Sequence, residues 1–195
     1  MDVFDSIRAE IVADPANLIG DFAGQRPLFQ AGSGARILIV GQAPGRRAQA
    51  SGIPWDDASG VTLRSWLGVS ADEFYDPELI ALLPMDFYYP GKGRSGDLPP
   101  RKEFASTWHP RLIAGMPALR LTILIGGYAQ KFYLGAAARA TLTETVRAFR
   151  EYPTDVLPLV HPSPLNFRWQ AKNPWFETDV VPELRRRVAA AFTQT

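Results

Sequence analysis

The stretch Val156–Asn166 reads VLPLVHPSPLN, and its two halves differ in character. The first half is almost wholly apolar, which is typical of a short strand buried in a sheet. The second half is a stiff turn, because the rings of Pro162 and Pro164 fix φ. This turn holds His161 at one end and Leu165 at its tip. A lone His-Pro pair is usually an incidental histidine before a proline turn. The complete hexapeptide HPSPLN is much less expected by chance, so it is the first candidate for a functional loop.

Three further apolar runs share the character of this strand. Each is followed by a glycine or proline turn and mostly by a helical pattern; they are Arg36–Val40, Leu79–Met85 and Leu121–Ile125. Apolar spacing and capping signals indicate helices at Val3–Val12, Leu63–Leu67, Tyr128–Leu134 and Asp179–Phe192. The segment Asp14–Gly34 shows no periodicity and is predicted to be a connecting loop. These elements predict an α/β fold, a three-layer α/β/α sandwich around a short, mainly four-stranded parallel sheet. No repeat or linker divides the chain, so we expect residues 1–195 to form one domain.

The composition excludes several kinds of chemistry. The 195 residues include no cysteine, which rules out disulfides, thiolate catalysis, iron–sulfur clusters and cysteine-ligated zinc. The only histidines are His109 and His161, too few for a histidine-rich metal site, so we expect no metal and no cofactor. The net charge of +1 argues neither for nor against nucleic acid. The amino-terminal stretch is acidic and amphipathic, and no apolar run is long enough to span a membrane. We therefore expect a soluble, cytoplasmic monomer that does not bind membranes.

A second loop follows the strand Arg36–Val40 and begins with the turn GQAPG, Gly41–Gly45. Open α/β sheets bind their ligands at the carboxyl ends of the strands, where this loop is expected to lie. Its glycine spacing fits neither the dinucleotide fingerprint nor a phosphate-binding P-loop. Taken alone, Gly-x-x-Pro-Gly is ordinary turn chemistry. The loop becomes a candidate because it and HPSPLN are expected on the same rim of the sheet.

A third loop, Asp86–Pro100, is rich in glycine, proline and aromatic residues and is long enough to suggest a function. Its aromatic side chains are expected to cover the core. The basic residues in and just after this loop have two open interpretations: they are a solvated surface, or they form a rim that faces phosphates. These residues are Lys92, Arg94, Arg101 and Lys102. The following segment Glu103–Ala114 is predicted to be helical around a break at Pro110, and His109 before it is interpreted as structural or surface, not catalytic.

HPSPLN and GQAPG together resemble the two signatures of the uracil-DNA glycosylase superfamily. Pro54-Trp55 and Ser59-Gly60 follow Ala43 at a spacing similar to that of the thermophilic-type members. The stretch LIGGYAQK, Leu124–Lys131, resembles a structural strand-to-helix joint of the classical members. The resemblance implies the sandwich fold predicted above and an enzyme that cleaves a damaged base from deoxyribose.

The resemblance also implies roles for single residues. His161 donates a hydrogen bond to uracil O2 as negative charge develops there, as in an oxyanion hole. Trp55 stacks on the uracil, with a place in the core as the alternative. Leu165 fills the gap left by the flipped nucleotide, and Ser163 holds a flanking phosphate together with backbone amides. The expected substrate contacts also include the end of the first strand: Gly41, Gln42 and Ala43.

The sequence departs from the superfamily at the first signature. Gln42-Ala43-Pro44 has no carboxylate or asparagine where the members carry one, so the residue that orients water has several candidates. We favour Asp57, then Asp56, with Gln42 as a weaker water positioner; a solvated acidic pair is the alternative for the two aspartates. The asparagine that reads the uracil edge is also not evident. Asp86 or backbone amides are the candidates for that task, and xanthine and hypoxanthine stay open as substrates.

The sequence thus predicts a monofunctional, cofactor-independent uracil-DNA glycosylase that acts on uracil-containing DNA and leaves an abasic site. Two alternatives come from other classes. The first is a uracil-DNA or damaged-DNA binding protein that has lost hydrolysis, and the second is a generic nucleotide-binding α/β module. No lysine is placed persuasively for lyase chemistry, and the preference for single or double strands stays open.

Overall fold

The computed structural model describes residues 2–18, 22 and 24–193 and centres on a sheet of four parallel strands. The strands are β1 (Ile37–Val40), β2 (Ile80–Leu82), β3 (Leu121–Ile125) and β4 (Val156–Leu159), in the spatial order β2-β1-β3-β4. In the register of the sheet, Ile37 of β1 lies beside Ile80 and Leu121. Because all four strands run the same way, the loops that follow them begin at one edge of the sheet.

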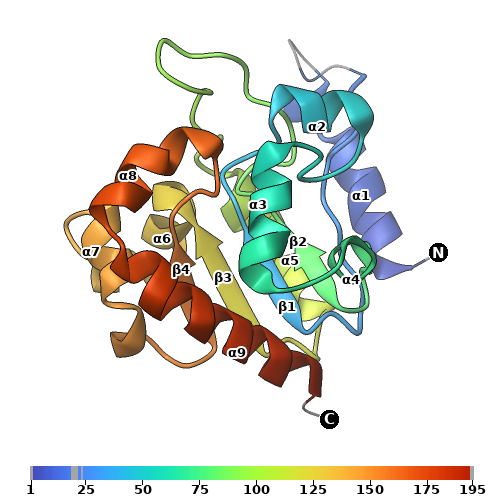
Figure 1. Ribbon diagram of the computed structural model, residues 1–195. Coiled ribbons are helices and arrows are strands. Elements are labelled where there is room, and N and C mark those ends of the chain that lie inside the picture. The colour runs from blue at the N-terminus through green and yellow to red at the C-terminus, as the bar shows by residue number, and fades with distance from the viewer. Residues whose placement is uncertain (1, 19–21, 23, 194–195) are drawn as a thin grey trace.

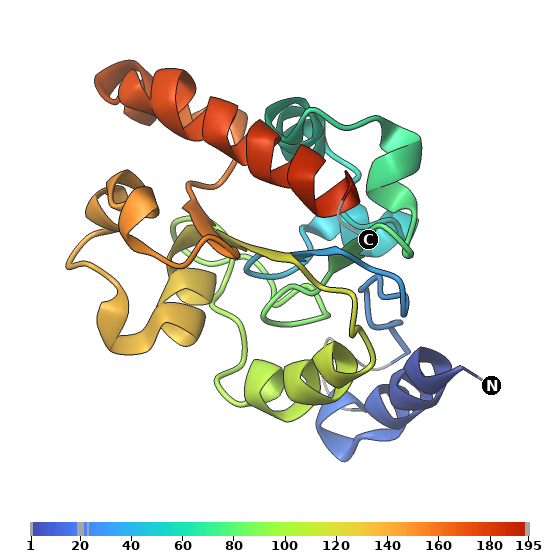
Figure 2. The ribbon, with the colours of Figure 1, turned by 90° about the horizontal axis from the view of Figure 1, so that it is seen from below.

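Helices cover both faces of this sheet (Figure 1). They include α1 (Val3–Ala13), α2 (Arg46–Ser51), α3 (Ala58–Leu67), α4 (Ala71–Tyr75), α5 (Phe104–Ala114), α6 (Gly126–Leu134), α7 (Leu142–Arg147), α8 (Phe167–Lys172) and α9 (Val181–Thr193). Single 3₁₀ turns lie at Pro15–Asn17, Gly135–Ala137, Phe149–Glu151 and Pro164–Asn166, and a π-helical turn, Phe176–Val180, leads into α9. Figure 2 shows α3 and α9 on one side of the sheet and α1 and α5 on the other.

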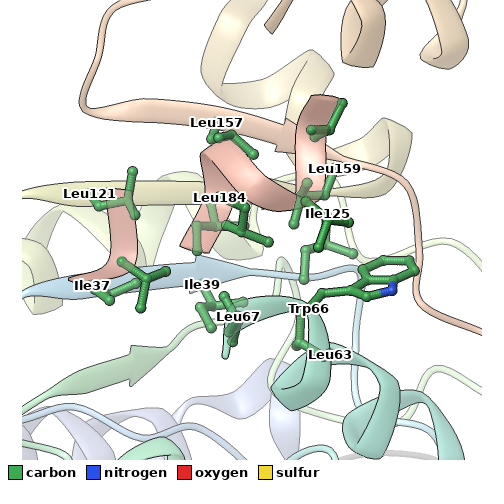
Figure 3. Packing of buried hydrophobic residues seen from close by; sticks show 14 of the residues in the cluster. Ile37, Ile39, Leu63, Trp66, Leu67, Leu121, Ile125, Leu157, Leu159 and Leu184 are labelled. Atoms are coloured by element: carbon green, nitrogen blue, oxygen red, sulfur yellow. The ribbon is translucent and has the colours of Figure 1, made fainter. Parts of the chain in front are cut away.

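Each strand contributes to two apolar cores, because successive side chains of a strand point to opposite faces. In β1, Ile37 and Ile39 face one core, and Leu38 and Val40 face the other. The first core lies under α3 and α9, and Figure 3 shows Leu63, Leu67 and Leu184 from these helices meeting the strand residues. The second core lies under α1 and α5. Since both faces are covered, the strands are continuous apolar runs, and the predicted α/β/α sandwich is confirmed.

The helix α3 frames the candidate site, and its ends follow from local sequence. Asp57 caps the helix by accepting a hydrogen bond from the Gly60 amide at 2.9 Å, and Gly68 ends it with φ of 72°. This cap starts the helix earlier than the predicted Leu63–Leu67. Capping boxes open α4 at Ser70–Glu73 and α7 at Thr141–Glu144, where the sequence carries the pattern Ser/Thr-x-x-Glu.

Several elements differ from the prediction. The predicted long loop after Gly45 contains α2, a run of good helix formers that Gly52 ends with φ of 71°. The helix α8 has no counterpart in the prediction. Pro110 does not break α5, because its neighbours Trp108 and Leu112 are buried and hold the helix in place. Pro182 lies in the first turn of α9, where a backbone amide has no partner within the helix. Of the predicted loop Asp14–Gly34, residues 19–21 and 23 lie outside the described part of the chain.

None of the helices in the described part of the chain is long and apolar enough to cross a membrane.

Candidate active site

A pocket of about 380 Å³ opens at the carboxyl edge of the sheet. This volume lies in the range of about 300–1,000 Å³ that is typical of small-molecule sites. The pocket brings together predicted site residues from two of the candidate loops: Gly41, Gln42, Ala43, Trp55, Asp57, His161, Ser163 and Leu165. A larger and more open groove of about 1650 Å³ lies beside α1 and α2 and shares only Leu28 and Pro54 with the pocket. We assign the chemistry to the smaller pocket because the candidate reactive side chains line it.

His161 is held in one tautomer by the turn that follows it. Its Nδ1 accepts a hydrogen bond from the Ser163 amide at 3.2 Å, so the neutral ring carries its proton on Nε2. The side chain of Asn166 donates to the His161 carbonyl at 2.7 Å and closes the turn. Burial lowers the pKa of His161, while the negative charges of Asp57 and Asp97 oppose that shift. His161 is therefore a neutral hydrogen-bond donor at neutral pH.

Leu165 stands at the tip of the same turn. The Ser163 hydroxyl accepts a hydrogen bond from the Leu165 amide at 3.2 Å, which adds to the stiffness given by the two prolines. The Leu165 side chain is 85% exposed, so it contributes little to the core. A rigid turn that holds a large apolar side chain in solvent is suited to insertion into an apolar environment such as a base stack.

Trp55 forms the wall opposite this turn. Its ring centroid lies 5.7 Å from that of His161, with 31° between the ring planes. The ring closely covers Gly41, where an added Cβ would lie 3.1 Å from Trp55 Cζ2. Trp55 has φ of 57°, a conformation rare for a large side chain. Its carbonyl abuts Gly60, where a Cβ would lie only 1.9 Å away. The Ser-Gly of the first signature thus makes room for the Trp55 backbone.

The three water-positioning candidates differ in where they lie. Asp57 lines the pocket, with one carboxylate oxygen on the Gly60 amide. Asp56 does not line it, and its nearest charged partner is Arg47 at 3.9 Å. Gln42 lines the pocket, but its side-chain amide donates to the Leu98 carbonyl at 2.9 Å. Asp57 is thus the only one of the three that brings a carboxylate to the pocket.

Asp86 does not reach the pocket, contrary to the expectation that it reads the base. Its side chain is fully buried and accepts two hydrogen bonds from the Arg101 guanidinium, at 2.7 and 2.8 Å. The backbone amides of Tyr88 and Arg101 also donate to it. The Arg101 guanidinium also donates a hydrogen bond to the side-chain oxygen of Asn17 at 2.6 Å. The pair is a structural clamp, which removes Asp86 from the pocket and Arg101 from the predicted basic rim.

His109 has a structural role, as the sequence indicates. It is buried on α5, where Nδ1 lies 2.7 Å from the Tyr133 hydroxyl and Nε2 lies 3.0 Å from the Pro84 carbonyl. Burial lowers the pKa of His109 to about 4, opposed by the hydrogen bond to Pro84. Pro84 lines the pocket, so His109 supports a pocket wall from behind.

Two charged residues of the loop Asp86–Pro100 line the pocket, Lys92, which the sequence offers as part of a phosphate-facing rim, and Asp97, which sequence reasoning missed. They face each other across a small hairpin, with Lys92 Nζ 3.6 Å from the Asp97 carboxylate. The signal available in the sequence is the glycine-rich centre of the loop, since glycines between two polar residues favour a hairpin turn. Within the described residues, no group of three or more acidic or histidine side chains could hold a metal ion.

The parallel sheet and this pocket define an α/β/α protein that holds a neutral histidine, an aromatic wall and an exposed apolar wedge at the carboxyl edge of its sheet. The family model described as "Uracil DNA glycosylase superfamily" matches residues 29–185, a segment that includes all four strands and both signatures. The chain belongs to this superfamily. Membership implies glycosylase chemistry, the hydrolysis of a bond between a base and its sugar.

Proposed function

We propose that the protein removes uracil from DNA by hydrolysing its N-glycosidic bond, which leaves an abasic site. The observation that carries this proposal is the setting of His161. Its Nδ1 is occupied by the Ser163 amide, so its Nε2 proton is free to serve a substrate in a pocket that Trp55 lines. A neutral donor of this kind suits a leaving group that becomes an anion.

The proposed reaction begins with extrusion of the nucleotide from the DNA. Leu165 enters the vacated space and offsets part of the lost stacking, which costs a few kcal/mol. The exposed position of Leu165 supports this role. Ser163 and the amides of its turn lie next to the wedge and hold a flanking phosphate. Extrusion delivers the base to the pocket against Trp55.

Cleavage then separates opposite charges. As the bond between C1′ and N1 breaks, negative charge moves onto uracil O2, where the His161 Nε2–H group donates to it. Positive charge develops on the deoxyribose, as in other glycoside hydrolyses. Asp57 is a fixed carboxylate in the same pocket and stabilises that cation. Its cap on α3 keeps it in place during the reaction.

The range of bases depends on how the pocket reads the base edge. With Asp86 committed to Arg101, backbone groups of the turn Gly41–Gly45 are the candidates for this reading. Backbone amides and carbonyls distinguish bases less strictly than a dedicated asparagine does. Hypoxanthine and xanthine therefore belong among the substrates to be tested beside uracil.

One observation favours a second function, binding without hydrolysis. The first signature carries Gln42, whose amide cannot take up a proton at neutral pH and is bound to the Leu98 carbonyl. A protein of this kind retains the pocket and the wedge but releases no base. The complex of such a binding protein with a uracil-containing strand is predicted to last at least as long as the complex of an active glycosylase with that strand.

A glycosylase assay distinguishes the two functions. End-labelled single- and double-stranded oligonucleotides that carry one uracil, hypoxanthine, xanthine or only thymine are incubated with the protein in chelator, and abasic sites are then cleaved with alkali. Cleavage only of the uracil strands supports the proposal. Specific retention of the uracil strand in a gel without cleavage supports the binder, and cleavage of another modified base changes the substrate.

A further inference from the structure

A small hairpin lies at the mouth of the pocket, within the loop Asp86–Pro100. Its backbone is closed by hydrogen bonds from the Leu98 amide to the Gly91 carbonyl and from the Gly93 amide to the Gly96 carbonyl, both at 2.9 Å. The hairpin supplies Lys92, Gly96 and Asp97 to the pocket lining. Neither signature supplies this part of the pocket wall.

Gln42 ties this hairpin to the end of β1. Its Nε2 donates to the carbonyl of Leu98, the residue that follows Asp97, at 2.9 Å. The first signature, Gln42-Ala43-Pro44, carries neither a carboxylate nor an asparagine. Its Gln42 instead anchors the segment that carries Asp97. This hydrogen bond from Gln42 to Leu98 therefore holds the residue next to Asp97 at the end of β1.

Two carboxylates line the pocket among the described residues, and their surroundings differ. Asp57 gives one oxygen to the Gly60 amide at the start of α3, where the helix dipole also favours its negative charge. Such a carboxylate suits a fixed charge. Asp97 has looser partners, the Lys92 ammonium at 3.6 Å and the Tyr89 hydroxyl at 3.4 Å. Its side chain is 37% exposed, so water reaches it directly.

His161 provides independent evidence that Asp97 lies near the reacting groups. The negative charges of Asp57 and Asp97 both counteract the effect of burial on the pKa of His161. Asp97 and Asp57 line the same pocket as His161, Asp97 from the hairpin and Asp57 from the start of α3.

We propose that Asp97 orients and deprotonates the water that attacks C1′ in the glycosidic cleavage, an inference that rests on the proposed function. The water oxygen bonds to C1′ and one of its protons passes to the Asp97 carboxylate. The bonding pair between C1′ and N1 leaves with the base, whose anion His161 stabilises. Asp97 then returns its proton to solvent and the base takes one up, so the reaction consumes one water. Asp57 remains the fixed charge beneath the sugar.

Single-turnover cleavage of a uracil oligonucleotide at saturating enzyme tests this assignment. The variant Asp97→Asn is compared with the wild-type protein and with Asp72→Asn, which changes an exposed aspartate on α4. Loss of a general base is expected to lower the rate by about 100-fold or more, while affinity for the uracil strand is kept. Asp72→Asn is expected to cleave at the wild-type rate. Added formate is expected to restore part of the rate of Asp97→Ala, because the exposed site admits a small carboxylate.

The outcomes separate this inference from the proposed function. An active wild-type protein with an equally active Asp97→Asn variant overturns the role of Asp97 alone. An inactive wild-type protein overturns both. A slow Asp97→Asn variant that has also lost affinity for the uracil strand, or an Asp97→Ala variant that formate does not accelerate, gives Asp97 a binding or structural role and contradicts the assignment.

Discussion

The clamp between Asp86 and Arg101 gives a sharp test of whether Asp86 is structural. In the variant Arg101→Met, the Asp86 carboxylate stays fully buried but loses both guanidinium hydrogen bonds. It keeps the backbone amides of Tyr88 and Arg101, at 3.1 and 3.2 Å. The variant therefore leaves the buried Asp86 carboxylate with only its two backbone hydrogen bonds to stabilise the negative charge.

The expected magnitude follows from these contacts. Removing one partner of a buried ion pair costs about 3–5 kcal/mol. We expect about 3 kcal/mol, the lower end of that range, because Asp86 keeps two amide donors and the Arg101 side chain is 27% exposed in the wild-type protein. For a chain of this length, 1 kcal/mol shifts the melting temperature by roughly 2–4 °C, so the variant is expected to melt about 6–12 °C lower.

Thermal unfolding followed by circular dichroism measures this loss, with Arg111→Met as the control. Arg111 forms an ion pair with Glu10 that is exposed on both sides, so its removal is expected to change the melting temperature little. The variant Asp86→Asn is assayed for cleavage of uracil, hypoxanthine and xanthine strands at a temperature where it is folded. We expect lower stability with unchanged base preference. An Arg101→Met variant as stable as the wild type, or an Asp86→Asn variant of normal stability that cleaves a different set of bases, refutes the reasoning.

Three further variants test other parts of the structure. Gly60→Ala drives a Cβ into the Trp55 carbonyl, so uracil cleavage is expected to fall sharply and stability by about 1–3 kcal/mol; a variant with wild-type cleavage and melting temperature contradicts this packing. Leu165→Ala is expected to keep the wild-type melting temperature but to cleave duplex uracil more slowly than single-stranded uracil, which needs no flipping; an equal effect on both strands argues against a wedge. His109 is neutral when buried, with its pKa lowered to about 4, so unfolding takes up a proton below pH 6.5. Its contribution to stability is complete above pH 6.5 and is lost towards pH 4, by about 1.4 kcal/mol per pH unit at most. Urea unfolding of His109→Gln is expected to depend less on pH over that interval, and an identical pH dependence of the two proteins contradicts the burial of a neutral His109.

The sheet could be predicted from the sequence because its signal is local. Each strand is a continuous apolar run followed by a glycine or proline turn, and a continuous apolar run is the pattern of a strand covered on both faces. The capping boxes at Ser70–Glu73 and Thr141–Glu144 are equally local. The helix α2 was missed because RRAQAS has no apolar stripe, so its helical preference is visible only through the glycines at its ends. The start of α3 is not evident from the sequence because it depends on the cap of Asp57 on the Gly60 amide.

The pocket was predicted less completely than the sheet, because it depends on contacts between distant segments. Residues in the two signatures could be placed on one rim, since parallel strands end at the same edge of a sheet. Asp86 is kept out of the pocket by hydrogen bonds that involve Arg101 and Asn17, and both residues lie far from Asp86 in the sequence. The approach of Asp97 depends on a hydrogen bond between Gln42 and Leu98. Neither contact leaves a periodic pattern in the sequence.

The most direct test of the proposed function is single-turnover uracil release by wild-type protein and by the variant His161→Ala. Loss of one donor to a developing anion lowers rates by about 100- to 1,000-fold, and we expect a decrease of this size with affinity for the uracil strand largely kept. Thymine-only strands serve as the control for uracil dependence. A wild-type protein that releases uracil and a His161→Ala variant that releases it equally fast would contradict the central role of His161.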